Sequence, residues 1–126
     1  MKTSDFRQLR AWQHAMDIVV EAYSIINLLP IEERFGLCDQ MRRSAVSIPS
    51  NIAEGQARNS SKEFIHFLSI ARGSIAELQT QILLCKRLEY IADPVISQIM
   101  VHLQDNDKMI GGLMRAISKK NSENDN

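Results

Sequence analysis

The amino-acid sequence predicts an all-α protein folded as an up-down-up-down antiparallel four-helix bundle. Three observations support this fold class: apolar residues recur every three or four positions along four long segments, turn-forming residues separate these segments, and no segment has the alternation of a strand. Only five glycines and three prolines occur in 126 residues, which favours long uninterrupted helices. Because the connections are short, sequential helices should be antiparallel neighbours. We expect a single domain over residues 1–126.

The first helix is predicted over residues 9–29. Its large apolar residues have helical spacing, so we expect them to face the core: Leu9, Trp12, Met16, Val19, Tyr23, Ile26 and Leu29. Pro30 ends this helix and suits the first turn of the next one. Glu32 and Glu33 would then lie at the positive end of the second helix dipole.

The second helix is predicted over residues 31–57, and its side chains fall on three faces. The apolar face contains Leu37, Cys38, Met41, Ala45, Ile48 and Ile52. The polar face contains Gln40, Arg43, Ser47, Asn51, Glu54 and Arg58. The third face carries small or compact residues, namely Val46, Pro49, Ser50, Ala53 and Ala57. Because the apolar pattern continues past Pro49, we expect this proline to bend the helix without ending it.

The third helix is predicted over residues 61–89, where Ser60 and Glu63 have the spacing of a capping box. Its predicted core residues are Phe64, Phe67, Leu68, Ala71, Ile75, Leu78, Ile82, Cys85 and Leu88. The fourth helix is predicted over residues 94–119, with Asp93 as its N-cap and Pro94 in its first turn. Its predicted core residues are Ile96, Ile99, Met100, Leu103, Ile110, Leu113, Met114 and Ile117. Residues 121–126 form a polar tail that we expect to fray.

Composition and charge exclude several classes of protein. Fifteen basic residues balance fifteen acidic ones, which argues against a strongly basic nucleic-acid-binding protein but leaves room for local patches. The first residues lack the apolar segment of a secretory signal, and no apolar run has the length of a membrane span. We therefore expect a cytoplasmic protein without a membrane partner, in which Cys38 and Cys85 are reduced core residues.

The polar face of the second helix has two interpretations. Arg43, Ser47, Asn51 and Glu54 present a cation, a hydroxyl, an amide and a carboxylate in a row, as a recognition site would. Alternatively, they form a hydrogen-bond network that fixes this helix to a neighbour, with Ser74 and Glu77 on the third helix as partners. We favour a structural network or a subunit contact, because short polar residues four positions apart suit close helix packing.

Small residues also line one side of the third helix. Ser69, Gly73, Ala76 and Thr80 project away from its core residues, and a glycine within a helix costs about 1 kcal/mol relative to alanine. Close approach of another helix would explain Gly73. That helix belongs either to a second copy of the chain or to the same bundle, and the sequence leaves both explanations open.

No pattern in the sequence indicates an enzyme. Glu63 and His66 have the Glu-x-x-His spacing of di-iron bundles, but Ala11 and Ile99 occupy the positions where His14 and His102 would need a glutamate. Neither cysteine has a histidine at helical spacing, and no glycine-rich phosphate-binding loop is present. We therefore expect no catalytic residues, no metal, no cofactor and no small-molecule substrate.

Basic residues form two modest clusters that are candidate nucleic-acid contacts. The first comprises Arg42, Arg58 and Lys62, beside Arg43, and the second comprises Arg115, Lys119 and Lys120. Solvated surface charge is the simplest explanation of each cluster. In a ring of identical subunits, however, a modest patch is multiplied and can bind nucleic acid through its phosphates.

Several motifs resemble those of the 23S rRNA intervening-sequence proteins, a family of four-helix bundles. The resemblance rests on Leu9-x-x-Trp12-x-x-Ala15, on Gln40-Met41-Arg42-Arg43-Ser44-Ala45 with Ser47-Ile48, on Asn51-Ile52-Ala53-Glu54-Gly55, and on Phe64-x-x-Phe67-Leu68-x-x-Ala71-Arg72-Gly73-Ser74-x-x-Glu77-Leu78. It extends over about residues 9–90. The resemblance implies a bacterial cytoplasmic bundle that assembles as a ring, with a pentamer as the expected state. A similar fold serves as the accessory subunit of diversity-generating retroelements, where it cooperates with a reverse transcriptase and binds nucleic acid.

These observations lead to two hypotheses of function. The first is a non-enzymatic homo-oligomer that acts as a scaffold or binding module associated with RNA. The second is a protein-interaction subunit that docks a larger enzyme, such as a reverse transcriptase. As candidate oligomer contacts we take the small residues Val46, Ser50, Ala53, Ala57, Ser69, Gly73 and Ala76.

Overall fold

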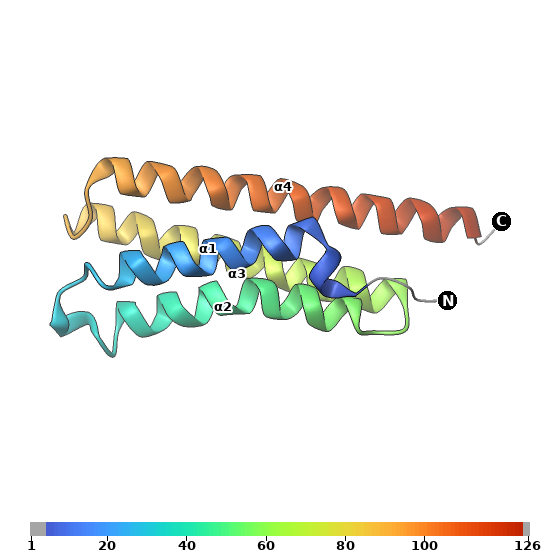
Figure 1. Ribbon diagram of the computed structural model, residues 1–126, viewed down its shortest axis with the longest axis horizontal. Coiled ribbons are helices and arrows are strands. Elements are labelled where there is room, and N and C mark those ends of the chain that lie inside the picture. The colour runs from blue at the N-terminus through green and yellow to red at the C-terminus, as the bar shows by residue number, and fades with distance from the viewer. Residues whose placement is uncertain (1–4, 125–126) are drawn as a thin grey trace.

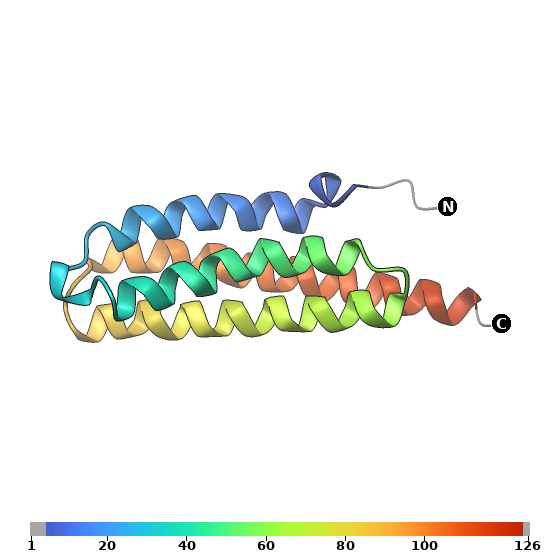
Figure 2. The ribbon, with the colours of Figure 1, turned by 90° about the horizontal axis from the view of Figure 1, so that it is seen from below.

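The computed structural model describes the main chain of residues 5–124 and the side chains of residues 5–122. Four long helices, α1 (Arg10–Ile26), α2 (Leu37–Gln56), α3 (Ser61–Arg87) and α4 (Asp93–Asn124), run alternately up and down the bundle (Figures 1 and 2). Each helix packs against the next, and α1 also packs against α4, which closes the bundle. The predicted all-α four-helix bundle is therefore confirmed.

The core is a continuous column of aliphatic side chains from all four helices. Its largest fully buried members are Ile18, Met41, Ile48, Ile52, Leu68, Ile75, Leu78, Ile82, Ile99, Leu103 and Ile110. Cys38 and Cys85 are both free and buried, as predicted. Burial raises the pKa of the Cys85 thiol to about 11, so this thiol stays protonated at neutral pH.

The core-facing side of α1 differs from the prediction. Ile26 and, just after the helix, Leu29 are buried as predicted, but the other buried residues of α1 are three alanines and two isoleucines that were not predicted for the core: Ala11, Ala15, Ala22, Ile18 and Ile25. The larger residues predicted for the core lie one position further round the helix, where Met16 is 42% exposed and Tyr23 is 40% exposed. Trp12 and Val19 are only partly buried. Small side chains let α1 approach its neighbours closely, so packing distance, and not side-chain size, selects the buried face.

The second helix begins six residues later than predicted, at Leu37. Pro30 does open a turn, but this turn is a short 3-10 helix, η2 (Ile31–Glu33), which ends before Gly36. Glu33 then acts as a cap from outside α2, because its Oε1 accepts a hydrogen bond from the main-chain nitrogen of Leu37 at 3.3 Å. Its Oε2 accepts a second bond from the Tyr90 hydroxyl at 2.8 Å. Glu33 thus joins the α1–α2 and α3–α4 connections.

Pro49 lies inside α2, which continues without a break to Gln56. Pro49 is buried and lines a groove together with residues of α1, and the apolar face continues through the buried Ile48 and Ile52, which favours an uninterrupted helix. The predicted continuity is confirmed, whereas a bend at Pro49 stays a prediction.

Three other helix ends differ from their predicted positions, and the first is the end of α1, which lies at Ile26 and not at residue 29. The third helix ends at Arg87, and Leu88, predicted for the core, is 51% exposed because the bundle ends there. Glu89 adopts a left-handed conformation with a φ of 61°, which stops the helix. The predicted tail also differs: α4 continues to Asn124, because no glycine or proline follows Ala116. Residues 125 and 126 of that tail lie outside the described residues.

Ser60 caps α3 as predicted, since its hydroxyl accepts a hydrogen bond from the main-chain nitrogen of Glu63 at 3.1 Å. Replacing Ser60 with Ala should therefore lower the free energy of unfolding by about 1 kcal/mol. Urea denaturation followed by circular dichroism measures this loss. Ser97→Ala, at an exposed position within α4, is the matched control and should not destabilise the protein. Equal stability of the two variants would contradict the capping role.

Candidate functional site

An apolar groove, hereafter the α1–α2 groove, runs between the first two helices. Its lining residues are Trp12, Met16, Val19, Val46, Pro49, Ser50 and Ala53. Ser50 is the only one of these that carries a side-chain hydroxyl, and none is charged. The third face of the predicted second helix and the displaced apolar residues of α1 thus form one surface. Its side chains remain accessible, as shown by Met16 and Val46, each 42% exposed.

The polar face of α2 meets α3 at its centre. The hydroxyls of Ser47 and Ser74 form a hydrogen bond of 2.7 Å between the two helices. Asn51 donates to the Ser47 hydroxyl at 2.9 Å and to the Ser47 carbonyl at 2.8 Å. Ser74 is also within hydrogen-bond distance, at 3.2 Å, of the Ile70 carbonyl. Ser47, Asn51 and Ser74, which were predicted as site residues, therefore form a hydrogen-bond network that connects α2 to α3. This arrangement agrees with the structural interpretation of the polar face.

The two ends of this polar face have different surroundings. Arg43 lies 3.4 Å from Asp39 on its own helix, and its side chain is 80% exposed. Glu54 pairs with Arg58 at 2.7 Å, again within the segment that ends α2. Glu77 is exposed and lines a shallow polar hollow with Gln40, Arg43, Ser44, Ser47 and Gln81. Arg43 and Glu77 thus share a hollow but form no ion pair there.

The small residues of α3 lie on an open surface. Ser69, Gly73 and Ala76 are exposed, and a Cβ placed on Gly73 would meet no described atom of another element within 4 Å. The explanation that Gly73 accommodates a neighbour within the same bundle is therefore wrong for the described residues. The glycine that does allow close approach is Gly55, where a Cβ would lie 2.9 Å from both Phe64 Cδ1 and Phe67 Cβ.

The two small-residue surfaces occupy different sides of the bundle. Pro49, Ser50 and Ala53 border α1 in the α1–α2 groove. On α3, Ser74 bonds to α2 and Arg72 bonds to Asp107 on α4, so Gly73 between them points away from both neighbours. Ala57 is exposed near the end of the groove surface. The chain therefore carries two separate faces with little side-chain bulk.

The predicted basic residues gather mainly at one end of the bundle. Arg58 and Lys62 lie at the α2–α3 connection, and the last turns of α4 carry Arg115, Lys119 and Lys120 at the same end (Figures 1 and 2). Arg58 is engaged there by Glu54 and lies over the Phe67 ring at 4.8 Å. Arg42 does not belong to this group, because it lies fourteen residues, about 21 Å, before the end of α2.

A polar cluster between α1 and α4 has no counterpart in the sequence analysis. Asn106 is fully buried, and its Nδ2 donates to the Ala11 carbonyl at 3.1 Å and lies 3.1 Å from His14 Nδ1. Nearby, His102 Nδ1 and Glu21 Oε1 lie 2.7 Å apart. The signal was the gap in the apolar spacing between Leu103 and Ile110, which Asn106 fills. This cluster fixes α1 against α4.

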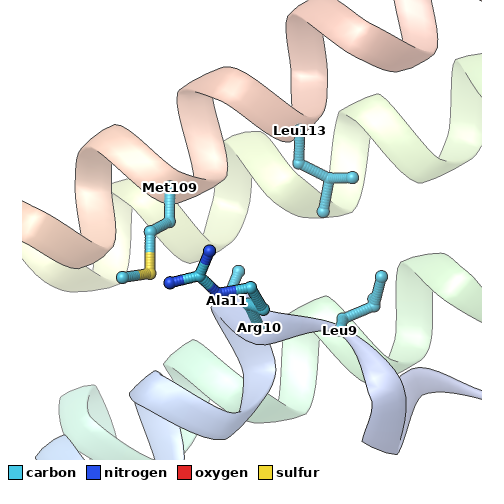
Figure 3. A pocket seen from close by; sticks show the side chains of 5 residues that line it. All are labelled: Leu9, Arg10, Ala11, Met109 and Leu113. Carbon is cyan, nitrogen blue, oxygen red and sulfur yellow. The ribbon is translucent and has the colours of Figure 1, made fainter.

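An apolar hollow also lies where the start of α1 meets α4 (Figure 3). Leu9 and Ala11 line one side, Met109 and Leu113 line the other, and the guanidinium group of Arg10 extends beside Met109. None of the residues predicted for the site lines this hollow.

Metal binding and membrane insertion can both be assessed from the described residues. Glu63 belongs to the α3 cap and His66 packs beside Phe67, with ring centroids 5.5 Å apart. In the described part of the chain, no three His, Cys, Asp or Glu side chains are arranged to hold a metal ion. Nor does any described helix have both the length and the apolar composition needed to cross a lipid bilayer.

Comparison with known proteins decides the family. The model of the 23S rRNA-intervening sequence protein family matches residues 7–112, which is most of the chain. The chain belongs to the 23S rRNA-intervening sequence protein family. A crystal structure of a protein of unknown function from the S23 ribosomal protein family of Bacteroides thetaiotaomicron resembles this member with a TM-score of 0.77. The two chains are 25% identical, and the match covers 82% of this chain and 97% of the other. No curated protein matches the chain.

Both the groove and the Ser47–Ser74 bond lie within the part that matches the 23S rRNA-intervening sequence protein family. The match ends at Gly112, and α4 continues for twelve residues to Asn124. Arg115, Lys119 and Lys120 are therefore outside the matched part of the chain.

Proposed function

We propose that this protein is a homo-oligomeric, non-enzymatic scaffold or binding module that associates with RNA. The observation that carries the proposal is the α1–α2 groove, an uncharged surface with accessible Trp12, Met16 and Val46. Continuous apolar surfaces of this kind are typical of protein–protein contacts. A second copy of the chain is the occupant that we expect.

The second copy would present its α3 surface to the groove. Ser69, Gly73 and Ala76 leave the α3 backbone open to close approach, and a Cβ on Gly73 would meet no described atom within 4 Å apart from the nearby backbone of α3. Contacts between two different faces are heterologous, and they build a closed ring when the rotation between subunits permits closure. We expect five subunits, the state implied by the family resemblance.

Association with RNA is supported by the common position of the two basic groups and by the family name, which refers to 23S rRNA. Each chain contributes Lys62, Arg115, Lys119 and Lys120 at one end of the bundle. A ring would repeat this basic patch in every subunit. The assembly would thus present many positive charges to RNA, although the net charge of each chain is zero.

Two measurements test this proposal. Static light scattering should give a mass several times that of the 14.3 kDa chain over a wide range of concentrations. Filter binding to structured RNA should show an affinity that falls steeply as salt increases. A concentration-independent monomer would contradict the assembly, and RNA binding that does not depend on salt would contradict the phosphate contacts.

The second candidate, a subunit that docks a larger enzyme such as a reverse transcriptase, is favoured by exposed apolar residues at the other end of the bundle. In the connection between α1 and α2, Leu28 is 58% exposed, Ile31 is 73% exposed and Phe35 is 86% exposed. The neighbouring genes distinguish the candidates, since a reverse transcriptase beside this gene favours docking and an rRNA locus favours the RNA-associated scaffold.

A further inference from the structure

Two arginine side chains from different helices meet over Gly111 of α4. The Nη1 atoms of Arg72 on α3 and of Arg115 on α4 each lie 3.5 Å from the position that a Cβ on Gly111 would occupy. Arg115 extends back along its own helix by one turn, whereas Arg72 crosses from the neighbouring helix. Two positive charges therefore share one small region of surface.

The charge in this region is only partly balanced. Asp107 accepts two hydrogen bonds from Arg72, from Nε at 2.8 Å and from Nη2 at 3.0 Å. This leaves the Nη1 group of Arg72 directed toward Gly111 and Arg115. Arg115 has no carboxylate within 4.0 Å among the side chains that the structure describes. The Asp107 carboxylate therefore pairs with only one of the two guanidinium groups, and an additional anion would relieve their repulsion.

Gly111 itself is buried beneath the two arginines, and the surface beside them is accessible at Gly112, which is partly exposed. Neither glycine carries a side chain, and among the described residues, apart from the nearby backbone of α4 itself, a Cβ on Gly112 would meet only Arg115 Nη2, at 3.8 Å. Lys108 and Lys119 lie on the same side of α4, two turns before and one turn after Arg115. A planar guanidinium group donates two parallel hydrogen bonds to phosphate oxygens, so paired arginines beside a bare backbone suit a phosphate group.

We propose that Arg72 and Arg115 form a binding site for a phosphate group, and that this group belongs to the backbone of bound RNA. The proposal rests on the RNA association proposed above and assigns it to named residues. It places the contact at the α3–α4 surface, with Arg115 beyond the part of the chain that matches the family model. Free phosphate ion has the same chemistry, so the experiment must separate the two sources.

Arg115→Gln is the informative variant, because Arg115 forms no hydrogen bond or ion pair within the described part of the chain. Its matched control is Arg87→Gln, which removes the same charge at the last residue of α3, at the end of the bundle that is far from Arg115. In fluorescence anisotropy with structured RNA at ~0.1 M salt, Arg115→Gln should weaken binding roughly five- to tenfold. It should also lower the slope of log affinity against log salt by about 0.7–0.9. Arg87→Gln should change neither quantity.

A second variant removes the site while preserving the helix. Gly112→Glu places a carboxylate beside Arg115 in open space, so it should reduce RNA binding as strongly as Arg115→Gln. Replacing a helical glycine should at the same time leave thermal stability unchanged or raised. If wild-type protein binds RNA and both variants bind as tightly as Arg87→Gln, the phosphate site is wrong while the proposed function stands.

An NMR titration with inorganic phosphate tests the site without RNA. The Nε–Hε resonances of Arg72 and Arg115 should shift with saturation in wild-type protein and should not do so in Gly112→Glu. If the arginine resonances shift with saturation but the protein binds no RNA, the site binds phosphate ion and its assignment to the RNA backbone is wrong. An absence of shifts together with unaltered RNA binding in the variants would overturn the site itself.

Discussion

Replacing Gly55 with Ala should destabilise the bundle by about 1–2 kcal/mol, although alanine is the better helix former. The added Cβ would lie 2.9 Å from Phe67 Cβ, 2.9 Å from Phe64 Cδ1 and 3.1 Å from the Phe64 carbonyl oxygen. Two of these atoms belong to the base of a side chain or to the backbone, so they cannot move without shifting α3. The cost of overpacking, about 1–3 kcal/mol, therefore exceeds the gain of about 1 kcal/mol from helix propensity.

Gly112→Ala is the matched control for this substitution. It makes the same chemical change within a helix, but the added Cβ would lie 3.8 Å from the flexible end of the Arg115 side chain. Here the helix propensity should dominate and raise the free energy of unfolding by up to about 1 kcal/mol. The melting temperature should thus fall for Gly55→Ala and rise for Gly112→Ala. A melting temperature for Gly55→Ala at or above that of wild type would show that α2 and α3 can separate freely at this point.

Ala53→Arg should disrupt the assembly and leave the fold of each subunit intact. Ala53 lines the α1–α2 groove, and in a single chain a long side chain at its edge can reach solvent, so the stability of the subunit should change by less than about 0.5 kcal/mol. If another subunit covers the groove, the same cation is buried without a partner. The penalty of about 3 kcal/mol or more would weaken each contact more than about a hundredfold.

Much of the fold could be predicted from local features of the sequence. Apolar spacing identifies all four helices, and Ser60 with Glu63 places the start of α3 correctly. The contact between Ser47 and Ser74 also followed from helical phase, since both residues lie beside the core face of their own helices. These features depend on neighbouring residues within one helix, which is why a single sequence reveals them.

Features that depend on contacts between distant segments were not predictable in the same way. The α1 sequence contains two apolar sides, and only the close packing of α2 and α4 selects the side with Ala15 and Ala22. The start of α2 depends on Glu33, whose carboxylate accepts a hydrogen bond from Tyr90, 57 positions further along the chain. Likewise, the meeting of Arg72 and Arg115 depends on the relative positions of α3 and α4.

The candidate site consists of the α1 residues that were wrongly predicted for the core and of the small residues of α2. The large apolar side chains of α1 were assigned to the core because of their helical spacing, and the structure places Met16 and Val19 in the α1–α2 groove instead. The small face of α2 had been recognised, but the surface opposite it had not. An apolar surface that the sequence places in the core, and that the folded chain leaves open, is the feature that a second subunit would cover.

Sedimentation equilibrium on wild type, Ala53→Arg and a control tests the central claim, that the α1–α2 groove is a contact between subunits. Val101→Arg is the control, because Val101 is 53% exposed and does not line the groove. Wild type and Val101→Arg should sediment as an assembly several times heavier than the 14.3 kDa chain, with five subunits expected. Ala53→Arg should sediment as a helical monomer. A monomeric wild type, or an Ala53→Arg variant that assembles like wild type, would contradict the account.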